Sequence, residues 1–537
     1  MKTKVVLAST MAVLTAQLAF SQNKSKPNFV VILLDDMGFA DLSCYGGPVP
    51  TPNIDKLAER GVRMSQMYNC ARSCPTRASL LTGLYPQQAG IGHMTEDISA
   101  KAGSNSYQGY LNNNCVTIAE VMSANGYYTA MTGKWHVGQG KGVTPFRRGF
   151  SHALHSAAGG FYFYDDPKSV VFLDDKKIDN NDPRLPEKWY STDLWTTYAM
   201  KYIGEAKEEK KPFMIYLAYN GAHFPLQASE SDVAKFKGKF NKGWGEIRNE
   251  VYQRQLEMNL LGKKYALTKS NPLIPDWSSL DEAQIKESEH IREIYAATVT
   301  KIDENIGRLV KDLKDKGLFD NTVIMIMADN GGNAEGKTVF GTYNGENPGQ
   351  VNSTVFLGQA WAETSNTPFY LYKHHTHEGG ISTPFVVSYP AGIPASMNGK
   401  IVSQPGHVID IMATLVAMSS ANYPKEFKGN DITPMQGINL FPIWKGQTTK
   451  RESPIFWEHE NNFALRDGKW KLVKENAEDN FQLYDMEADR TETNDLSQKE
   501  PNVLKQMKVE FDAMFKKTGS AYVDFKTGRW FVSPQKY

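Results

Sequence analysis

Polar side chains with metal-ligating oxygens follow two apolar segments that lie far apart in the sequence. Asp35 and Asp36 come directly after the first of these segments, and Asp329 and Asn330 come directly after the second. In doubly wound sheets, ligands bind beyond the carboxyl ends of the strands. Three carboxylates and one amide oxygen form an all-oxygen ligand set, which suits calcium or magnesium better than zinc. We predict one Ca2+ here, because calcium accepts irregular coordination.

A candidate anion site lies at residues 73–83, which read Ser-Cys-Pro-Thr-Arg-Ala-Ser-Leu-Leu-Thr-Gly. Proline is favoured in the first turn of a helix, so Ser73 is expected at a helix N-terminus. Free N–H groups and the helix dipole attract anions there. Arg77 lies one turn further along. The segment therefore predicts an exposed hydroxyl beside an anion site, with an ordinary capped helix as the alternative.

The elements that must position these residues indicate an α/β fold. Nearly unbroken apolar runs are typical of strands that helices cover on both faces. We predict strands over 28–34, 127–131, 213–218, 322–328 and 384–389. Apolar residues at helical spacing predict helices over 52–61, 116–125 and 280–316. The expected core is a large, mostly parallel sheet between helices.

The pattern changes beyond Gly446. Short alternating runs separated by turn residues are typical of an antiparallel sheet. These runs lie at 454–458, 463–466, 470–473 and 482–485, and a helix is expected at 501–517. We therefore expect a catalytic α/β domain over 22–446 and a smaller C-terminal α+β subdomain over 447–537.

The first 21 residues are predicted to be a signal peptide. Lys2 and Lys4 precede an apolar run that ends in Ala-Phe-Ser, a pattern that signal peptidase cleaves, here after Ser21. The run is shorter than the about 20 apolar residues of a membrane span, so no stable membrane insertion is expected. The protein is expected to be exported, to the periplasm or the medium of a bacterium.

Composition excludes several classes of protein. The 537 residues include 60 basic and 59 acidic side chains, which leaves no basic field for binding nucleic acid. A mean hydropathy of −0.46 excludes a polytopic membrane protein. Four cysteines are too few for a disulfide scaffold. In an exported protein, the sequence still allows a Cys70–Cys74 or a Cys44–Cys115 disulfide.

The segment that begins at Ser73 resembles the signature of the formylglycine-dependent sulfatases, of the arylsulfatase and carbohydrate sulfatase type in the alkaline-phosphatase-like superfamily. In that family a Cys or Ser that opens the pattern C/S-x-P-x-R is oxidised to formylglycine (3-oxoalanine). Only the frame that begins at Ser73, and not at Cys74, places Pro75 and Arg77 correctly. The other family segments follow in family order: Asp35-Asp36, Gly133 to His136, His223 to Leu226, Asp329 to Gly332, and Lys373 ahead of Glu378-Gly379-Gly380.

This resemblance implies an enzyme that hydrolyses sulfate esters on host glycans or aryl sulfates, with residue 73 matured by a formylglycine-generating enzyme. The implied catalytic residues are Ser73, Arg77, Lys134, His136, His223 and Lys373. The implied ligands of one Ca2+ are Asp35, Asp36, Ser73, Asp329 and Asn330. His223 would protonate the leaving oxygen, and His136 would deprotonate a hydroxyl of the formylglycine hydrate.

Other polar residues are assigned by their position in the sequence alone. We expect a sugar to meet Asn220, Gln227, Glu458 and His459, and we expect His374, His375 and His377 to form an active-site wall. Two alternative functions stay open. One is a phosphate monoester or diester hydrolase that uses unmodified Ser73, and the other is a non-catalytic protein that binds sulfated glycans.

Overall fold

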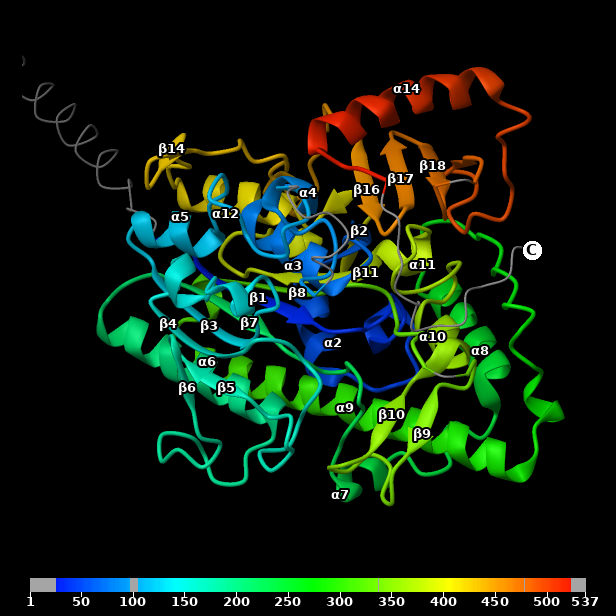
Figure 1. The fold of residues 1–537 in the computed structure, drawn as a ribbon, viewed down its shortest axis with the longest axis horizontal. Helices are drawn as coiled ribbons and strands as arrows, with labels where there is room; N and C mark the ends of the chain where they lie inside the picture. The colour runs from blue at the N-terminus through cyan, green and yellow to red at the C-terminus, as the bar shows by residue number, and fades with distance from the viewer. Residues whose placement is uncertain (1–25, 97–104, 337, 478, 523–537) are drawn as a thin grey trace, which may run out of the picture.

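The computed structural model describes residues 26–96, 105–336, 338–477 and 479–522. The expected signal peptide, 1–21, lies outside the described residues. Among them, eleven strands form one central sheet in the order β12-β2-β11-β8-β1-β7-β3-β4-β5-β6, with β13 beside β2 (Figure 1). These strands are β1 Asn28–Leu34, β2 Val62–Tyr68, β3 Tyr128–Lys134, β4 His152–Ser156, β5 Val171–Leu173, β6 Lys176–Ile178, β7 Phe213–Ala218, β8 Thr322–Ala328, β11 Ser382–Ser388, β12 Lys400–Val402 and β13 Gly406–His407.

The centre of this sheet is parallel, as the sequence predicts. Strands β8, β1, β7, β3 and β4 run in the same direction, whereas β11 is antiparallel to both of its neighbours, β8 and β2. All five strands predicted from apolar runs are present, with ends that differ from the prediction by no more than three residues. The expected mostly parallel α/β sheet is confirmed.

The unbroken apolar run of β1 is explained by two hydrophobic cores, one on each face of the sheet. Val30 and Ile32 pack into one core, and Val31 and Leu33 pack into the other, because successive side chains of a strand point to opposite faces. The first core holds α2 Pro52–Glu59, α6 Ser191–Glu208, α8 Gly243–Glu257, α9 Glu282–Asp315 and α10 Gly358–Ser365. The second holds α3 Ser73–Thr82, α5 Ile118–Ala124, α12 Asp410–Ser419 and α13 Phe441–Trp444.

Two of the predicted helices begin at capping boxes. Asp281 accepts a hydrogen bond from the N–H of Gln284 at the start of α9, and Thr117 accepts one from the N–H of Glu120 at the start of α5. The shorter elements are α4 Pro86–Ala89, α7 Glu230–Ala234, α11 Glu378–Ile381, β9 Thr342–Asn344, β10 Thr354–Phe356, β14 Glu426–Phe427 and β15 Asn430–Asp431.

A second, smaller sheet lies near the C-terminus (Figure 1). It is antiparallel, in the order β16-β17-β18-β19, and its strands are β16 Ile455–His459, β17 Asn462–Asp467, β18 Trp470–Lys474 and β19 Gln482–Asp485. Leu465 and Leu472 on one face pack against Phe511 of α14 Pro501–Thr518. Trp457 and Val473 on the other face pack in a cluster with Tyr68 of β2. The antiparallel sheet is confirmed, and the domain boundary near residue 446 stays a prediction.

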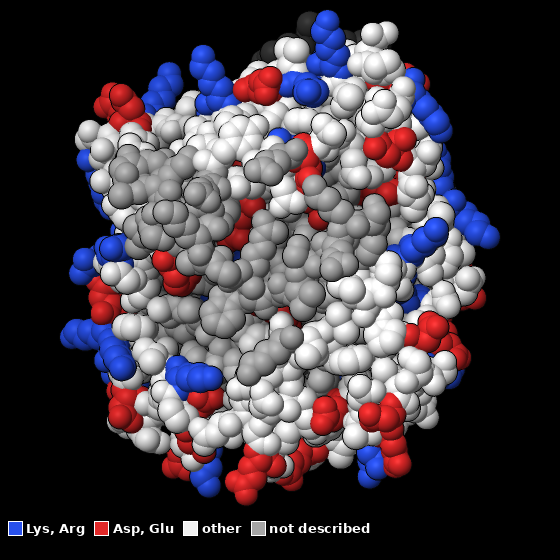
Figure 2. Space-filling model, turned by 45° about the vertical axis from the view of Figure 1, so that its right-hand side comes forward, with Lys and Arg blue, Asp and Glu red and all other residues white. Residues whose placement is uncertain are grey.

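The four cysteines, Cys44, Cys70, Cys74 and Cys115, are all free and buried, so neither bridge left open by the sequence is present. Among the described helices, none is both long and apolar enough to cross a membrane. Acidic and basic side chains are interspersed over the described part of the face in Figure 2, in agreement with the balanced composition.

Candidate active site

The two polar segments predicted to share one sheet edge do lie side by side. Strands β1 and β8 pair in parallel with Leu34 opposite Ala328, so Asp35 and Asp329 leave the sheet together. The N–H of Asp36 donates to Asp329 Oδ1 at 3.2 Å, and Asn330 Nδ2 donates to Asp36 Oδ1 at 2.7 Å. All four side chains are buried. Parallel pairing brings them together because parallel strands end at the same edge.

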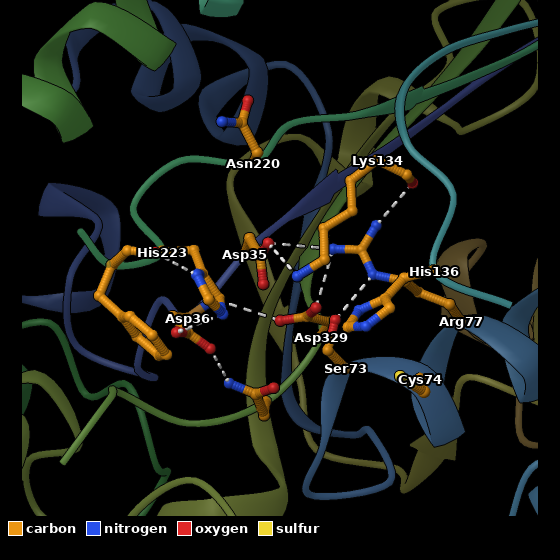
Figure 3. A network of polar contacts seen from close by, with 12 residues as sticks. Asp35, Asp36, Ser73, Cys74, Arg77, Lys134, His136, Asn220, His223 and Asp329 are labelled. Carbon is orange, nitrogen blue, oxygen red and sulfur yellow. Dashed lines mark hydrogen bonds and ion pairs between the residues drawn. The ribbon is translucent and has the colours of Figure 1, made fainter. Parts of the chain in front are cut away.

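Ser73 begins α3, and its side chain points toward this acidic cluster (Figure 3). Arg77, one turn further along α3, connects the two. Its guanidinium donates to Ser73 Oγ at 2.9 Å, to Asp329 Oδ2 at 2.8 Å and to the carbonyl of Lys134 at 3.0 Å. The side chain of Arg77 is fully buried. Its contacts therefore fix the position of the N-terminus of α3 relative to the carboxylates.

Cys74 lies outside this network (Figure 3). Its Sγ atom lies 3.7 Å from Met94 Sδ and 3.9 Å from Thr95 Oγ1, and burial raises the pKa of the thiol to about 12. At the start of the helix, successive side chains point in different directions. Ser73, and not Cys74, therefore faces Arg77 and the carboxylates.

Three more of the predicted side chains come from β3 and from the loops after β7 and before β11. Lys134 ends β3, and its Nζ donates to Asp35 Oδ2 at 2.6 Å. His223 lies in the loop after β7, with Nε2 3.7 Å from Asp36 Oδ2. Lys373 comes from the loop before β11 and places Nζ 2.9 Å from Asp36 Oδ1. Three cationic or imidazole groups thus surround the carboxylates of Asp35 and Asp36.

The ionisation of the two histidines follows from burial and from the neighbouring lysines. Burial and the charge of Lys134 lower the pKa of His136 to about 4. Burial also lowers the pKa of His223 to about 3; Asp36 opposes this shift, whereas Lys134 and Lys373 add to it. Both imidazoles are therefore neutral at neutral pH. A bound anion between Lys134 and Lys373 would raise the pKa of His223, as proton donation by this residue requires.

The acidic cluster fits a hard divalent cation. Asp35 Oδ1 and Asn330 Oδ1 are buried, and within the described residues neither atom has a hydrogen-bond partner. Burial and the charge of Asp35 raise the pKa of Asp329. Burial of Asp36 disfavours its ionisation, but Lys373, His223, Lys134 and the hydrogen bond from Asn330 together outweigh burial and hold the pKa of its carboxyl well below the usual range. A bound Ca2+ would accept coordination from the buried oxygens that lack a hydrogen-bond donor. It would also offset the repulsion between the carboxylates.

Comparison with known proteins agrees with this geometry. The profile of the family described as Sulfatase matches residues 27–420, and that described as N-sulphoglucosamine sulphohydrolase, C-terminal, matches residues 369–517. The chain belongs to the sulfatase family. It is therefore a sulfuric ester hydrolase, and the predicted resemblance is confirmed at the level of the family.

Two relatives and one solved structure illustrate the similarity. The sulfatase is 32% identical to an arylsulfatase of Klebsiella aerogenes, over 84% of this chain and 99% of the relative. It is 26% identical to an N-acetylgalactosamine-6-O-sulfatase of Bacteroides thetaiotaomicron, over 90% and 92% of the two chains. The crystal structure of Ps i-CgsB in complex with k-i-k-neocarrahexaose superposes with a TM-score of 0.67 at 25% identity, over 92% of this chain and 93% of the other.

The structure of the sulfatase adds residues that the sequence analysis missed. Asn333 Nδ2 donates to Asp36 Oδ2 at 2.6 Å, and Thr76 Oγ1 donates to the carbonyl of Asp329 at 2.6 Å. Arg72 pairs with Glu335 at 2.7 Å, and Glu335 in turn lies 3.6 Å from Lys373 Nζ. Asn333 and Arg72 lie close in the sequence to the motifs, and this was the one signal that could have pointed to them. An Asn or Arg at such a spacing does not by itself specify a contact with the site.

Three residues that the sequence suggested for sugar binding have protein partners instead. Asn220 accepts hydrogen bonds from Ser191 and Trp195, and Gln227 donates to Asp166. The carboxylate of Glu458 has three neighbours in the protein: Gln87 at 2.7 Å, Tyr107 at 2.8 Å and His93 at 3.2 Å. All three suggested residues are buried. The expectation that they bind sugar hydroxyls is therefore corrected, since these groups stabilise the fold around the site.

The histidines expected to form an active-site wall pair with acidic residues near the C-terminal sheet. His374 Nδ1 lies 3.1 Å from Glu460, and His377 Nδ1 lies 3.1 Å from Glu492. His375 Nδ1 and His377 Nε2 lie 3.7 and 3.6 Å from the carboxylate oxygens of Glu475. This segment is therefore an interface between the loop of Lys373 and the C-terminal sheet.

The pairing of His377 predicts a dependence of stability on pH. Burial opposes its protonation, but Glu492 and Glu475 outweigh burial and raise the pKa to about 9. This value lies above the pKa of about 6.5 in the unfolded chain. Protonated His377 therefore contributes its full stabilisation to the fold below about pH 6.5. The stabilisation falls as pH rises and is lost above about pH 9. It amounts to roughly 3 kcal/mol.

Chemical denaturation of wild type and His377→Gln between pH 6 and 10 tests this. The difference between their unfolding free energies is expected to shrink with rising pH, while groups common to both proteins cancel. A difference that stays constant across this range would contradict the assignment.

Proposed function

We propose that the sulfatase hydrolyses O-sulfate esters of carbohydrates at a formylglycine made from Ser73, with one Ca2+ bound by Asp35, Asp36, Asp329, Asn330 and residue 73. The observation that carries the proposal is the contact of Ser73 Oγ with Arg77, whose guanidinium also binds Asp329. This contact places residue 73 between a helix N-terminus and a set of oxygen ligands. When present, the formylglycine hydrate would supply two geminal hydroxyls, and calcium would favour ionisation of one of them.

The protein's own side chains then have distinct roles. Arg77 holds residue 73 by a charge-assisted hydrogen bond and opposes protonation of an oxygen there. Lys134, Lys373 and His223 surround the space next to Asp35 and Asp36, where they would bind the sulfate oxygens and stabilise their charge. His223 would give its proton to the leaving oxygen, and neutral His136 would accept a proton from the second hydroxyl of residue 73.

A carbohydrate substrate is supported by the relatives and by the rim of the site. Both the Bacteroides relative and the solved Ps i-CgsB complex bear names that refer to sugars. Arg72, which pairs with buried Glu335 next to Lys373 and has a side chain that is 12% exposed, is a polar group that could meet sugar hydroxyls beyond the sulfate. The Klebsiella relative is named an arylsulfatase, so an aryl sulfate is the competing substrate.

The leaving group distinguishes these substrates through His223. A sugar alkoxide is a poor leaving group and needs a proton, whereas 4-nitrophenolate leaves without one. We expect His223→Ala to lower kcat for a sugar sulfate by about 10²- to 10⁴-fold. The loss with 4-nitrophenyl sulfate should be less than about tenfold. His290→Ala, which changes a half-buried histidine of α9, is the matched control and should alter neither rate.

Steady-state kinetics on a panel of mono- and disaccharides sulfated at different positions, with aryl sulfate and aryl phosphate alongside, tests the assignment. Efficient hydrolysis of the aryl sulfate alone would rule out the carbohydrate proposal. Aryl phosphate turnover equal to that of the sulfates, with unmodified Ser73, would instead favour the phosphate hydrolase. Binding without turnover of any ester would favour a glycan-binding protein.

Export and maturation complete the proposal. The sequence predicts cleavage after Ser21, followed by a periplasmic or secreted protein, and a maturation enzyme must reach Ser73 in the unfolded chain because that side chain is only 2% exposed in the fold. N-terminal sequencing of the protein from a native periplasmic fraction should begin at Gln22.

A further inference from the structure

A buried cluster of charges connects the loop of Lys373 with the C-terminal sheet. Lys471 of β18 places Nζ 3.0 Å from Glu378 Oε1 and 2.8 Å from Glu492 Oε1. Arg490 Nε lies 3.2 Å from Glu378 Oε2. The four side chains are at most 1% exposed. We call Glu378, Lys471, Arg490 and Glu492 the buried ion cluster.

Glu378 belongs to the same loop as Lys373, which we call the Lys373 loop (370–381). The N–H of Glu378 donates to Glu492 Oε2 at 2.8 Å, so the cluster holds both the backbone and the side chain at this position. Tyr68 and Ser382 donate to the other carboxylate oxygen of Glu378 at 3.1 and 2.9 Å. With five polar partners, the position of Glu378 is tightly determined.

The Lys373 loop transmits this position to the active site. The N–H of Gly379 donates to the carbonyl of Tyr370 at 2.9 Å, which closes the loop on its own start. The N–H of Lys373 donates to the carbonyl of Gly332 at 3.2 Å, and the N–H of Gly331 donates to Gly380 at 3.0 Å. The loop is therefore bound to the segment that directly follows Asp329 and Asn330.

Close backbone packing leaves the loop little room to shift. A Cβ atom at Gly379 would lie 2.0 Å from the carbonyl oxygen of Leu371, and one at Gly380 would lie 1.9 Å from that of His375. Neither position can hold any side chain without moving the backbone. A displacement of Glu378 would consequently move the segment that carries Lys373.

We propose that Lys471 and Arg490 are positioning residues of the sulfatase: they neutralise Glu378 and thereby hold Lys373 Nζ beside Asp36. The C-terminal sheet then completes the sulfate pocket without contributing a group that touches the substrate. This inference rests on the proposed role of Lys373 in binding sulfate.

The physical reason is the pair of buried carboxylates. Lys471 lies between Glu378 and Glu492, and without it their negative charges would face each other in a medium that screens poorly. Removing one member of a buried ion cluster leaves an uncompensated charge, which the protein can relieve only by moving that charge toward water. Since Glu378 belongs to the Lys373 loop, this relief would displace the loop.

The test compares Lys471→Met with Lys469→Met. Lys469 lies two residues away, next to the same hairpin turn, but is 44% exposed and pairs with Asp485 at the surface. We expect Lys471→Met to raise KM for 4-nitrophenyl sulfate by about 10- to 100-fold and to change kcat less, because the displaced Lys373 would bind the sulfate more weakly. Hydrogen exchange of residues 370–381 should quicken, while Lys469→Met matches wild type in both measurements.

Arg490→Lys is the second variant, for the case in which Lys471→Met does not fold. It keeps the charge but loses the contact of Nε with Glu378, so a smaller rise of KM with the same local change in exchange is expected. The proposal is overturned if the folded variant, whichever of the two it is, keeps wild-type KM and wild-type exchange at 370–381.

Two measurements that need no turnover separate this inference from the proposed function. One is hydrogen exchange in the absence of substrate, and the other is calorimetry of the binding of inorganic sulfate. Faster exchange and weaker sulfate binding in Lys471→Met would support the positioning role even if the wild type cleaved no sulfate ester. Conversely, normal turnover of sulfate esters by both variants, with unchanged exchange, would contradict the positioning role alone.

Discussion

Replacing Ser73 with alanine is expected to lower kcat for sulfate esters by at least about 10⁴-fold, because the variant loses the oxygen that we propose attacks sulfur. In the structure, Ser73 lies at the N-terminus of α3 and its hydroxyl contacts Arg77. Binding need not weaken in parallel, since Lys134 and Lys373 remain. Steady-state kinetics with any substrate identified from the panel measures this effect.

Cys74→Ala is the matched control for Ser73→Ala. It changes the adjacent residue, leaves Pro75 and Arg77 in place, and removes a buried thiol that contacts Met94 and Thr95 rather than the carboxylates. Turnover within about tenfold of wild type is expected. Mass spectrometry of the peptide from the native host should show residue 73 two hydrogens lighter, or its hydrate. Full activity with unmodified Ser73 would eliminate the aldehyde mechanism.

Replacing Asp329 with asparagine is expected to cause the second large loss, of about 10³-fold or more in kcat/KM. The change keeps the size of the side chain but removes one of three carboxylate charges, and the charge of the ligands sets calcium affinity. Added calcium should restore little activity. Asp320→Asn, an exposed position just before the same strand β8, is the control and should behave as wild type.

Thermal unfolding gives this prediction a readout that does not depend on activity. A ligand that binds only the folded state raises Tm, so calcium should stabilise the wild type and Asp320→Asn but not Asp329→Asn. Without calcium, Asp329→Asn loses the charge that faces Arg77 but also removes a buried carboxylate whose pKa is raised by burial and by Asp35, so the rise of Tm on adding calcium, rather than Tm itself, is compared between the proteins. Calcium-dependent stabilisation of Asp329→Asn, with activity retained in a chelator, would show that the cation site is elsewhere.

The sequence by itself determined the elements and the motifs that they carry. Strands β1 and β8 are recognisable because residues buried on both faces leave an unbroken apolar run, and their ends deliver Asp35 and Asp329 to the same edge. The segment from Ser73 to Gly83 reports both a helix start and a family signature. Such patterns are local, so they can be interpreted without knowing the neighbours in space.

Only the tertiary structure decided which polar groups meet. Glu458, Asn220 and Gln227 were expected near the substrate. Their polar atoms instead form hydrogen bonds inside the protein, with partners up to 371 positions away in the chain. The same holds for His377, whose acidic partner Glu492 follows far along the chain.

Spacing in the sequence does not encode such partners, because a side chain's environment depends on which faces of distant elements pack together. Burial then decides the energetics, since a polar group removed from water must find a partner within the protein. That requirement, rather than any local pattern, places Lys471 beneath the loop of Lys373 and sets apart the residues that can reach a substrate from those that hold the site in shape.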